Sequence, residues 1–168
     1  KKDKNIIRMN ENEVMDVLNT VEYGNVQMTK HQMAFRERTK ERDLAIMTLM
    51  LGTGIRVSEC AGLDLTDVDL RANTITIVRK GGGQDILYFS DEIHDALEAY
   101  INGERNRVLP ESGEETALFL SLKRKRISVD AIEVLVKKYS QMAVPNKKST
   151  PHKLRSTYGT ALYRETGD

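Results

Sequence analysis

One segment of this chain has an apolar spacing unlike that of the residues around it. Residues 73–78 read N-T-I-T-I-V, in which polar and apolar side chains alternate, and residues 85–89 read D-I-L-Y-F, which is rich in strand-forming side chains. Three consecutive glycines, at positions 81–83, separate the two runs. The pattern predicts an antiparallel hairpin with its tip at the glycines.

The sequence on both sides of this hairpin has helical spacing. A first helix is predicted to begin at Asn10, which is placed to form a capping box with Glu13, and to end near Gly24. Residues 36–43 carry seven charges in eight positions and predict a turn, followed by a buried helix over residues 44–54. Further helices are predicted over residues 55–63, 90–101, 128–141 and from residue 150 onward. The expected fold class is therefore α+β, mainly helical, with a small antiparallel sheet against a helical core.

Composition limits what kind of protein this is. The chain has 168 residues, of which 39% are hydrophobic and 30% charged, which suits one compact domain. No apolar run approaches the roughly 20 residues that cross a bilayer, and the Lys-rich start lacks the apolar stretch of a signal peptide. Cys60 is the sole cysteine, so a disulfide framework or a cysteine-based zinc cluster within the chain is excluded. We expect a cytoplasmic protein.

The net charge of +1 conceals an uneven distribution. Between residues 121 and 155 only Asp130 and Glu133 are acidic. The basic residues of that stretch are Lys123, Arg124, Lys125, Arg126, Lys137, Lys138, Lys147, Lys148, Lys153 and Arg155. A cationic patch of this kind can attract a polyanion such as DNA, although a solvated basic face without a partner has the same composition.

The last predicted helix carries a possible phosphate site. Thr150 can cap it and Pro151 suits its first position, which places His152 and Arg155 on one face near the N-terminus. The free amides and the dipole of a helix N-terminus favour an anion there. The alternative is a structural histidine beside a surface arginine.

Two further candidates lie at glycine-rich turns. Arg56 follows a G-T-G turn that can hold its backbone in place, and Glu59 is placed to pair with its guanidinium. Lys80 precedes the glycines of the hairpin, where a proton donor could engage a leaving group. The structural alternatives are a local Arg–Glu pair and a polar hairpin tip.

Three motifs occur in a fixed order along the chain. They are G-T-G-I-R-V-S-E-C-A-G-L at residues 52–63, V-R-K-G-G-G at 78–83, and T-P-H-K-L-R-S-T-Y-G-T-A-L at 150–162. Together they resemble the tyrosine recombinase, or phage-type integrase, family, and within it the integrases of bacterial conjugative transposons. The resemblance extends from about Met9 to Asp168, and it favours the functional interpretation of all four candidates over the structural one.

The resemblance implies site-specific DNA recombination, in which a tyrosine attacks a DNA phosphodiester to give a 3′-phosphotyrosyl link and a free 5′-hydroxyl. By this likeness Arg56 and Arg155 clamp the non-bridging oxygens, where two planar guanidiniums stabilise the developing charge. His152 hydrogen-bonds the phosphate or handles the tyrosine proton, and Lys80 protonates the leaving oxygen. Glu59 supports the site. No metal or nucleotide cofactor is expected, because the phosphotyrosine conserves the bond energy and the arginines replace a Lewis acid.

The expected partner is duplex DNA at recombination sites, bound by a tetramer of the intact protein in the bacterial cytoplasm, at the nucleoid. The DNA contacts are assigned to Lys123, Arg124, Lys125, Arg126, Lys147, Lys148 and Lys153. Residues 1–9 are expected to be an interdomain linker and residues 10–168 the catalytic domain.

The chain departs from the family pattern at its C-terminus. Family members continue into a segment with a further His or Trp and then the nucleophilic Tyr, and the sequence stops before both. Tyr158 falls on the apolar face of its predicted helix, and Tyr163 lies 11 residues beyond His152, or ~16 Å along the axis. We therefore expect a catalytic domain without its nucleophile, unable to cleave DNA covalently.

Two rival functions remain compatible with the sequence. A type IB topoisomerase uses the same catalytic residue types, although the compact hairpin and the G-T-G-I-R-V-S-E motif look more like an integrase. A DNA-binding regulator that keeps the fold without the chemistry is the second rival. Strand exchange between two sites separates the first from a recombinase, and covalent protein–DNA adducts separate the second.

Overall fold

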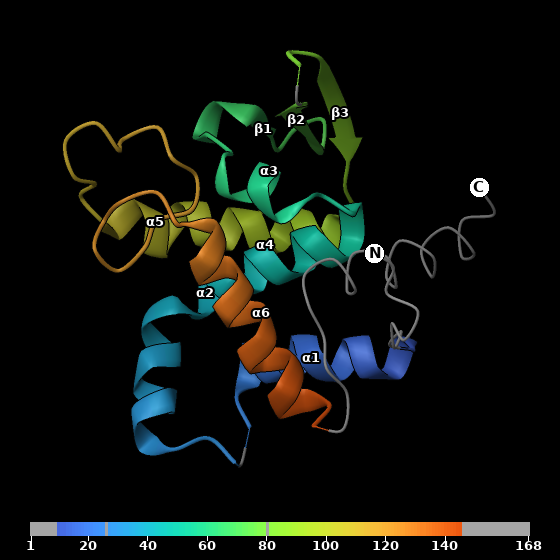
Figure 1. The fold of residues 1–168 in the computed structure, drawn as a ribbon, viewed down its shortest axis with the longest axis vertical. Coiled ribbons are helices and arrows are strands. Elements are labelled where there is room, and N and C mark those ends of the chain that lie inside the picture. Colours follow the sequence, from blue (N-terminus) through green and yellow to red (C-terminus); the bar gives the residue numbers. More distant parts are fainter. Residues whose placement is uncertain (1–9, 26, 80, 146–168) are drawn as a thin grey trace.

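The computed structural model describes residues 10–25, 27–79 and 81–145 (Figure 1). In chain order the elements are α1 (Glu11–Tyr23), α2 (Lys30–Thr53), α3 (Val57–Ala61), the 3-10 turn η1 (Leu65–Asp67), β1 (Val68–Asp69), β2 (Thr74–Val78), β3 (Gln84–Tyr88), α4 (Asp91–Asn102), α5 (Glu104–Arg107) and α6 (Val129–Ala143). The mainly helical fold with one small antiparallel sheet confirms the expected fold class.

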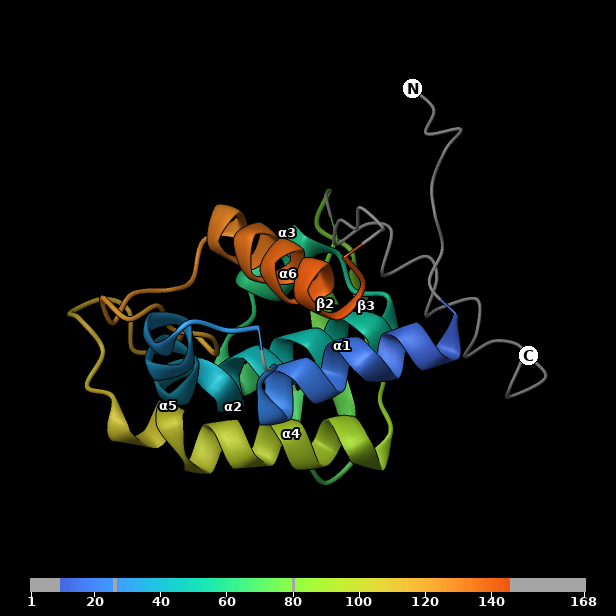
Figure 2. The same cartoon turned by 90° about the horizontal axis from the view of Figure 1, so that it is seen from below.

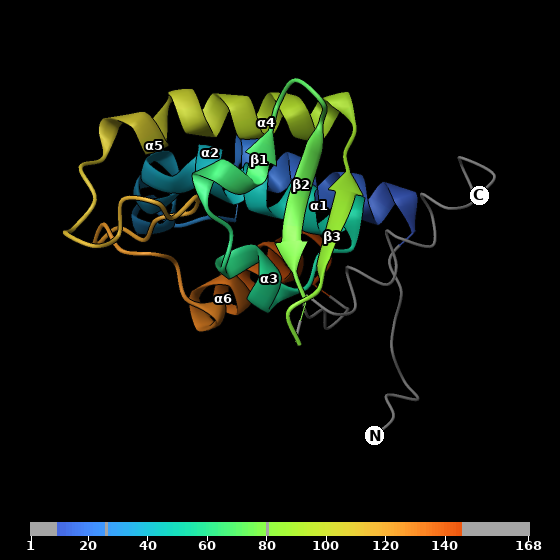
Figure 3. The same cartoon turned by 90° about the horizontal axis from the view of Figure 1, so that it is seen from above.

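The helices form layers. Figures 2 and 3 show α4 and α6 on opposite sides of the molecule, with α1 and α2 between them. The long helix α2 contacts α1, α4 and α5, while α6 packs on α1 and α3. A run of apolar side chains in the second half of α2, from Ala45 to Leu51, is buried at the centre of these layers.

Both long N-terminal helices begin with a capping box. The amide of Glu13 donates to the Asn10 side chain and the Glu13 carboxylate accepts from the amide of Asn10, as predicted, and the helix ends at Gly24. Thr29 and Gln32 form the same reciprocal bonds at the start of α2. Each pair satisfies two amides that a helix N-terminus otherwise leaves without partners.

The turn predicted over residues 36–43 is wrong, because α2 runs through this charged segment without a break. Neither glycine nor proline interrupts it, and most of its charges find partners in the fold. Arg36 donates through Nε to the carbonyl of Val21, 2.9 Å away, and also to the carbonyl of Glu22. Arg36 thereby satisfies carbonyls at the C-terminal end of α1. The charged segment is therefore a helix that packs on α1, and it is not an exposed turn.

Asp43 is the centre of a second buried polar group. Its carboxylate is fully buried and accepts from Arg42 at 2.9 Å, from the Thr39 hydroxyl at 3.0 Å and from the Tyr139 hydroxyl of α6 at 3.0 Å. Burial, and then the charge of Asp43, raise the pKa of Tyr139, so its hydroxyl stays a donor. The group ties α2 to α6 across the core.

The predicted hairpin is confirmed and gains a third strand. The sheet order is β1-β2-β3, and both pairings are antiparallel. Ile75 of the central strand β2 lies opposite Val68 of β1 and opposite Leu87 of β3. Ile75 and Ile77 are buried against the helices, whereas Val78, Ile86 and Tyr88 are exposed. Figure 3 shows the sheet crossing the helical layers, with the tip of the hairpin on the α3 side.

A long irregular segment, residues 108–128, connects α5 to α6. Its backbone is held by polar side chains: Tyr100 donates to the Leu118 carbonyl and accepts from the Leu120 amide, and Arg105 donates to the carbonyl of Ala117. Leu118 and Phe119 are buried in the core. The segment is therefore part of the packed domain. Among the described helices, none combines the length and the apolar character needed to cross a membrane.

Candidate functional site

Arg56 lies in the bend between α2 and α3. Gly54 ends α2 in the left-handed conformation, with φ of 72°, and its amide donates to the Met50 carbonyl. Ile55 is buried, and Arg56 itself is the N-cap residue of α3. The backbone of Arg56 is thus fixed from both sides while its side chain is exposed.

The Arg56 guanidinium has no protein partner among the residues that the structure describes, either in an ion pair or in a hydrogen bond. Glu59 instead bonds the backbone, since its Oε1 accepts from the Arg56 amide at 3.0 Å. The prediction of an ion pair between Glu59 and the Arg56 guanidinium is thus wrong. The guanidinium is left free to bind an external anion.

The second oxygen of Glu59 pairs with Arg79, which the sequence analysis missed. Glu59 Oε2 lies 3.0 Å from Arg79 Nη1, and Asp85 Oδ2 lies 2.7 Å from Arg79 Nε. The hydrogen bond to Asp85, followed by the charge of Glu59, raises the pKa of Arg79. The alternation in 73–78 could have predicted this, because it places Arg79 on the same side as buried Ile77, where a charge needs partners.

Arg79 also closes the hairpin through its backbone. Its amide donates to the Gly83 carbonyl at 2.6 Å and its carbonyl accepts from the Gly82 amide at 3.0 Å. Gly81 and Gly82 have φ of 97° and 96°, which side chains with a Cβ rarely adopt. The glycine run is therefore required by the turn, and the first residue of the turn is bonded to α3.

Three of the predicted catalytic residues, Lys80, His152 and Arg155, lie outside the described residues, as do Lys147, Lys148 and Lys153 of the predicted DNA contacts. The structure therefore places Arg56 and Glu59 of the predicted site and brings them together with Arg79. Tyr158 and Tyr163 also lie outside the described ranges.

The remaining predicted DNA contacts divide into two kinds. Lys123 and Lys125 are exposed in the loop before α6. Arg124 pairs with Glu111 at 2.7 Å, and its Nη1 donates to the carbonyl of Leu109. These bonds close the loop between residues 109 and 124 and leave the two lysines at its surface.

Arg126 has a structural position. Its Nη1 donates to the carbonyls of Ala61 and Leu63, and its Nη2 lies 2.5 Å from Asp64 Oδ1. The side chain is one-third exposed. Arg126 therefore joins the loop before α6 to the end of α3, and its guanidinium is largely occupied by protein partners.

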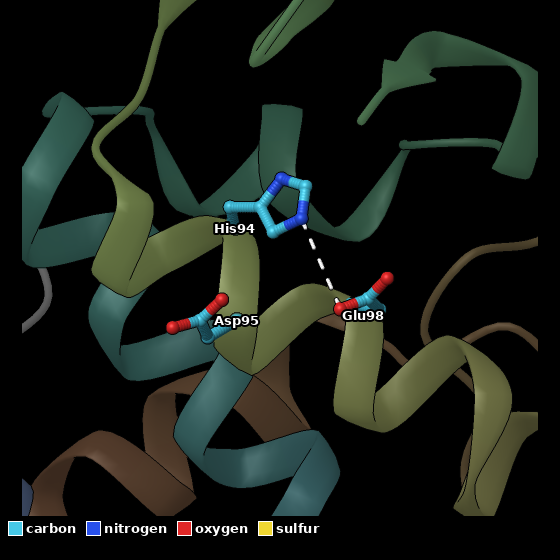
Figure 4. A group of neighbouring side chains, drawn as sticks. All are labelled: His94, Asp95 and Glu98. Atoms are coloured by element: carbon cyan, nitrogen blue, oxygen red, sulfur yellow. Dashed lines mark ion pairs between the residues drawn. The ribbon is translucent and has the colours of Figure 1, made fainter. Parts of the chain in front are cut away.

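A third polar cluster lies away from Arg56, on α4. His94, Asp95 and Glu98 have possible ligand atoms within 4.8 Å of one another, and His94 Nε2 is 3.9 Å from Glu98 Oε1 (Figure 4). The Nδ1 of His94 lies 2.8 Å from Asn73 Oδ1, in the turn between β1 and β2. The cluster thus joins this turn to α4.

Cys60 is the single cysteine and takes no part in an exposed site. It is fully buried in α3, and burial raises the pKa of its thiol to about 12. Cys60 therefore belongs to the core.

Comparison with known proteins agrees with this arrangement. The sequence pattern of the phage integrase family matches residues 8–168. Tyrosine recombinase XerS of Streptococcus agalactiae is 39% identical over 160 residues, which are 92% of this chain and 44% of the relative. XerS of Streptococcus equi subsp. zooepidemicus is 39% identical over 148 residues, which are 86% of this chain and 40% of that protein.

Solved structures share the fold. The crystal structure of XerA recombinase has a TM-score of 0.77 and 27% identity, over 96% of this chain and 52% of that one. The Tn1549 transposon integrase in complex with transposon right end DNA has a TM-score of 0.70 and 17% identity, over 98% and 56%. XerH bound to its difH substrate has a TM-score of 0.73 and 21% identity, over 96% and 44%.

The mainly helical domain with a small antiparallel sheet is the fold that this chain shares with XerA recombinase. The chain belongs to the phage integrase family, the tyrosine recombinases. This confirms the predicted resemblance. The chain spans less than half the length of the curated relatives named above.

Proposed function

We propose that the protein containing this chain carries out site-specific recombination of duplex DNA by transesterification through a 3′-phosphotyrosyl intermediate. XerS, at 39% identity, is named a tyrosine recombinase, and XerH is named in complex with its DNA substrate. Both support DNA as the substrate of this chain. Within the domain, residues 1–9 serve as a linker and residues 10–168 as the catalytic unit.

The observation that carries this proposal is the state of Arg56. A buried Ile55 and the glycine cap of α2 fix its backbone, yet its guanidinium is exposed and has no partner among the described residues. An exposed arginine without a partner on flexible backbone is common, but one on fixed backbone loses only side-chain entropy when it binds a phosphate.

The proposed reaction uses each candidate at a stated atom. The tyrosine oxygen attacks the phosphorus, the bond from phosphorus to the 5′ oxygen breaks, and that oxygen takes a proton from the Lys80 ammonium. Arg56 and Arg155 donate to the two non-bridging oxygens, whose negative charge grows in the transition state. His152 either accepts the tyrosine proton or donates to the phosphate. The free 5′-hydroxyl of the partner strand then attacks the phosphotyrosine and reverses these steps.

Glu59 acts by support in this scheme, because its carboxylate holds the amide of Arg56 rather than the guanidinium. DNA outside the scissile phosphate contacts the exposed Lys123 and Lys125, together with Lys147, Lys148 and Lys153. Arg124 and Arg126 shape that surface through their protein partners. The active assembly is a tetramer on DNA at the bacterial nucleoid.

A nicked duplex carrying a recombination site, incubated with the intact protein that contains this chain, tests the proposal. A nick just 3′ of the cleavage point lets the short leaving strand diffuse away, so a covalent protein–DNA adduct accumulates and can be seen on a denaturing gel. Strand exchange between two such sites, rather than relaxation of a supercoiled plasmid alone, distinguishes a recombinase from a type IB topoisomerase. Non-covalent binding without any adduct would contradict the proposal.

Peptide mapping of the adduct locates the nucleophile. Tyr100 and Tyr139 are buried with their hydroxyls bonded, which makes both unsuitable. From the family pattern we place the nucleophilic tyrosine outside residues 1–168, and Tyr158→Phe and Tyr163→Phe should leave the adduct intact. Loss of the adduct on either substitution would show that the nucleophile lies within this chain.

A further inference from the structure

Arg79 is bonded through both its side chain and its backbone, although it lies at the surface beside a glycine turn. Its guanidinium bonds two carboxylates, Glu59 of α3 and Asp85 of β3, and its amide and carbonyl bond Gly83 and Gly82. A side chain that bonds only within its own hairpin would stabilise the hairpin alone. The bond to Glu59 differs, because it joins the hairpin to α3.

Glu59 is shared between two arginines. One oxygen accepts from the amide of Arg56 and the other from the guanidinium of Arg79, each at 3.0 Å. The side chain of Glu59 is only 10% exposed, whereas that of Arg79 is 37% exposed. One nearly buried carboxylate thus fixes the position of Arg56 relative to the base of the hairpin.

We propose that Arg79 is a positioning residue for DNA cleavage, which holds the base of the hairpin against the N-terminus of α3. This inference rests on the proposed function, in which Lys80 supplies a proton to the leaving oxygen. Lys80 follows Arg79 directly in the sequence, and this inference assigns to Arg79 the anchoring of the chain that leads into it. Preorganised placement of an acid relative to the phosphate clamp is what proton transfer in the transition state requires.

Substitution of Arg79 should therefore resemble a partial loss of the proton donor. We expect Arg79→Gln to slow adduct formation by about tenfold, and Lys80→Ala to slow it by ~10²-fold or more, the range typical of a lost general acid. Arg79→Lys keeps one ion pair and should recover part of the rate. Asp85→Asn removes one partner of Arg79, leaves Glu59 in place, and should have a smaller effect than Arg79→Gln.

A substrate with sulfur in place of the 5′-bridging oxygen separates positioning from general damage. A thiolate leaves without a proton because its pKa is much lower than that of an alcohol, so this substrate does not need the acid. We expect Arg79→Gln and Lys80→Ala to cleave the sulfur substrate within about twofold of the unmodified protein. Arg56→Ala should stay slow on both substrates, because the phosphate clamp is still needed.

Arg71→Gln is the matched control. Arg71 is an exposed arginine in the turn between β1 and β2, and its side chain has no ion pair within the described ranges. Its substitution should leave both rates unchanged. Amide hydrogen exchange gives a readout that is independent of activity: Arg79→Gln should speed exchange in peptides covering residues 52–63 and 78–85, and leave α4 unchanged.

The outcomes separate this inference from the proposed function. If the unmodified protein forms no adduct, the proposed function fails, while the exchange experiment still tests the tie between hairpin and α3. If the unmodified protein is active and Arg79→Gln cleaves the oxygen substrate at the full rate, Arg79 has no positioning role. A defect of equal size on both substrates would show that Arg79 only maintains the fold.

Discussion

Two arginines of this domain, Arg42 and Arg56, occupy opposite situations. Arg42 is 8% exposed and its guanidinium bonds the Asp43 carboxylate and the carbonyl of Leu120. Arg56 is exposed, and its guanidinium has no partner among the described residues. A buried charge that lacks a partner strongly destabilises a domain, so Arg42 shows what the core requires. The free guanidinium of Arg56 contributes little to the fold, as the proposed role in binding phosphate requires.

The largest expected effect concerns the buried side of this comparison. Asp43→Ala removes the carboxylate that Arg42, Thr39 and Tyr139 bond, and leaves the buried Arg42 charge without an opposite charge beside it. We expect the free energy of unfolding to fall by about 3–5 kcal/mol. Urea denaturation measures it. A loss below ~1 kcal/mol would show that the network is solvated and that burial does not distinguish the two arginines.

Arg56→Ala provides the opposing measurement of stability. Since its guanidinium has no described protein partner, we expect the free energy of unfolding to change by no more than about 0.5 kcal/mol. The same urea titration applies. A loss comparable with that of Asp43→Ala would make Arg56 a structural residue.

The core around α3 can be probed by pH. Burial raises the pKa of the Cys60 thiol to about 12, from an ordinary value of 9.0, so the folded protein keeps the thiol protonated. The stabilisation is complete below pH 9 and is lost as the pH rises toward 12, because the unfolded chain releases this proton first. By pH 10 the free energy of unfolding should have fallen by about 1 kcal/mol through this thiol. The loss should appear in the unmodified protein and be absent from Cys60→Ala.

Thiol alkylation is the simpler check of the same core. At pH 8 iodoacetamide should react slowly with folded protein and quickly in urea, because a buried protonated thiol is a poor nucleophile. Rapid alkylation of the folded protein would show that α3 opens readily, and with it the bend that presents Arg56.

The smallest effect is expected at the surface lysines. Lys123 and Lys125 are exposed in the loop before α6. If each neutralises one phosphate, replacing either with Ala should make the log–log slope of DNA affinity against salt shallower by about 0.9. Arg126→Ala should instead lower stability, since Arg126 bonds Ala61, Leu63 and Asp64. Equal salt slopes for the lysine variants and the unmodified protein would exclude them from the interface.

Local signals in the sequence were sufficient for much of the fold. The capping box of Asn10 and Glu13, the glycine turn and the alternation of the hairpin each depend on neighbouring residues, and the structure shows all three. The charged half of α2 could not be predicted in this way, because the residues that bury it are distant. Tyr139, which bonds Asp43, is 96 positions further along the chain.

The same division applies to the site. Arg56 and Glu59 were found through their motif, but the sequence suggested a bond between their side chains, and the carboxylate instead bonds the amide of Arg56 and the side chain of Arg79. That pairing depends on where the hairpin packs, which spacing does not reveal. The role of Arg126 was missed for the same reason, since its partners lie 62 to 65 residues earlier.

We propose that Arg56, whose guanidinium has no partner among the described residues, binds the scissile phosphate. Adduct formation on the nicked substrate tests it most directly, with Arg56→Ala compared with Arg38→Ala, an exposed arginine on α2. We predict that Arg56→Ala slows the adduct by at least ~10²-fold, as expected for loss of one preorganised donor to the transition state, and that Arg38→Ala does not slow it. Equal rates for Arg56→Ala and the unmodified protein, with both folded, would show that Arg56 does not bind the scissile phosphate.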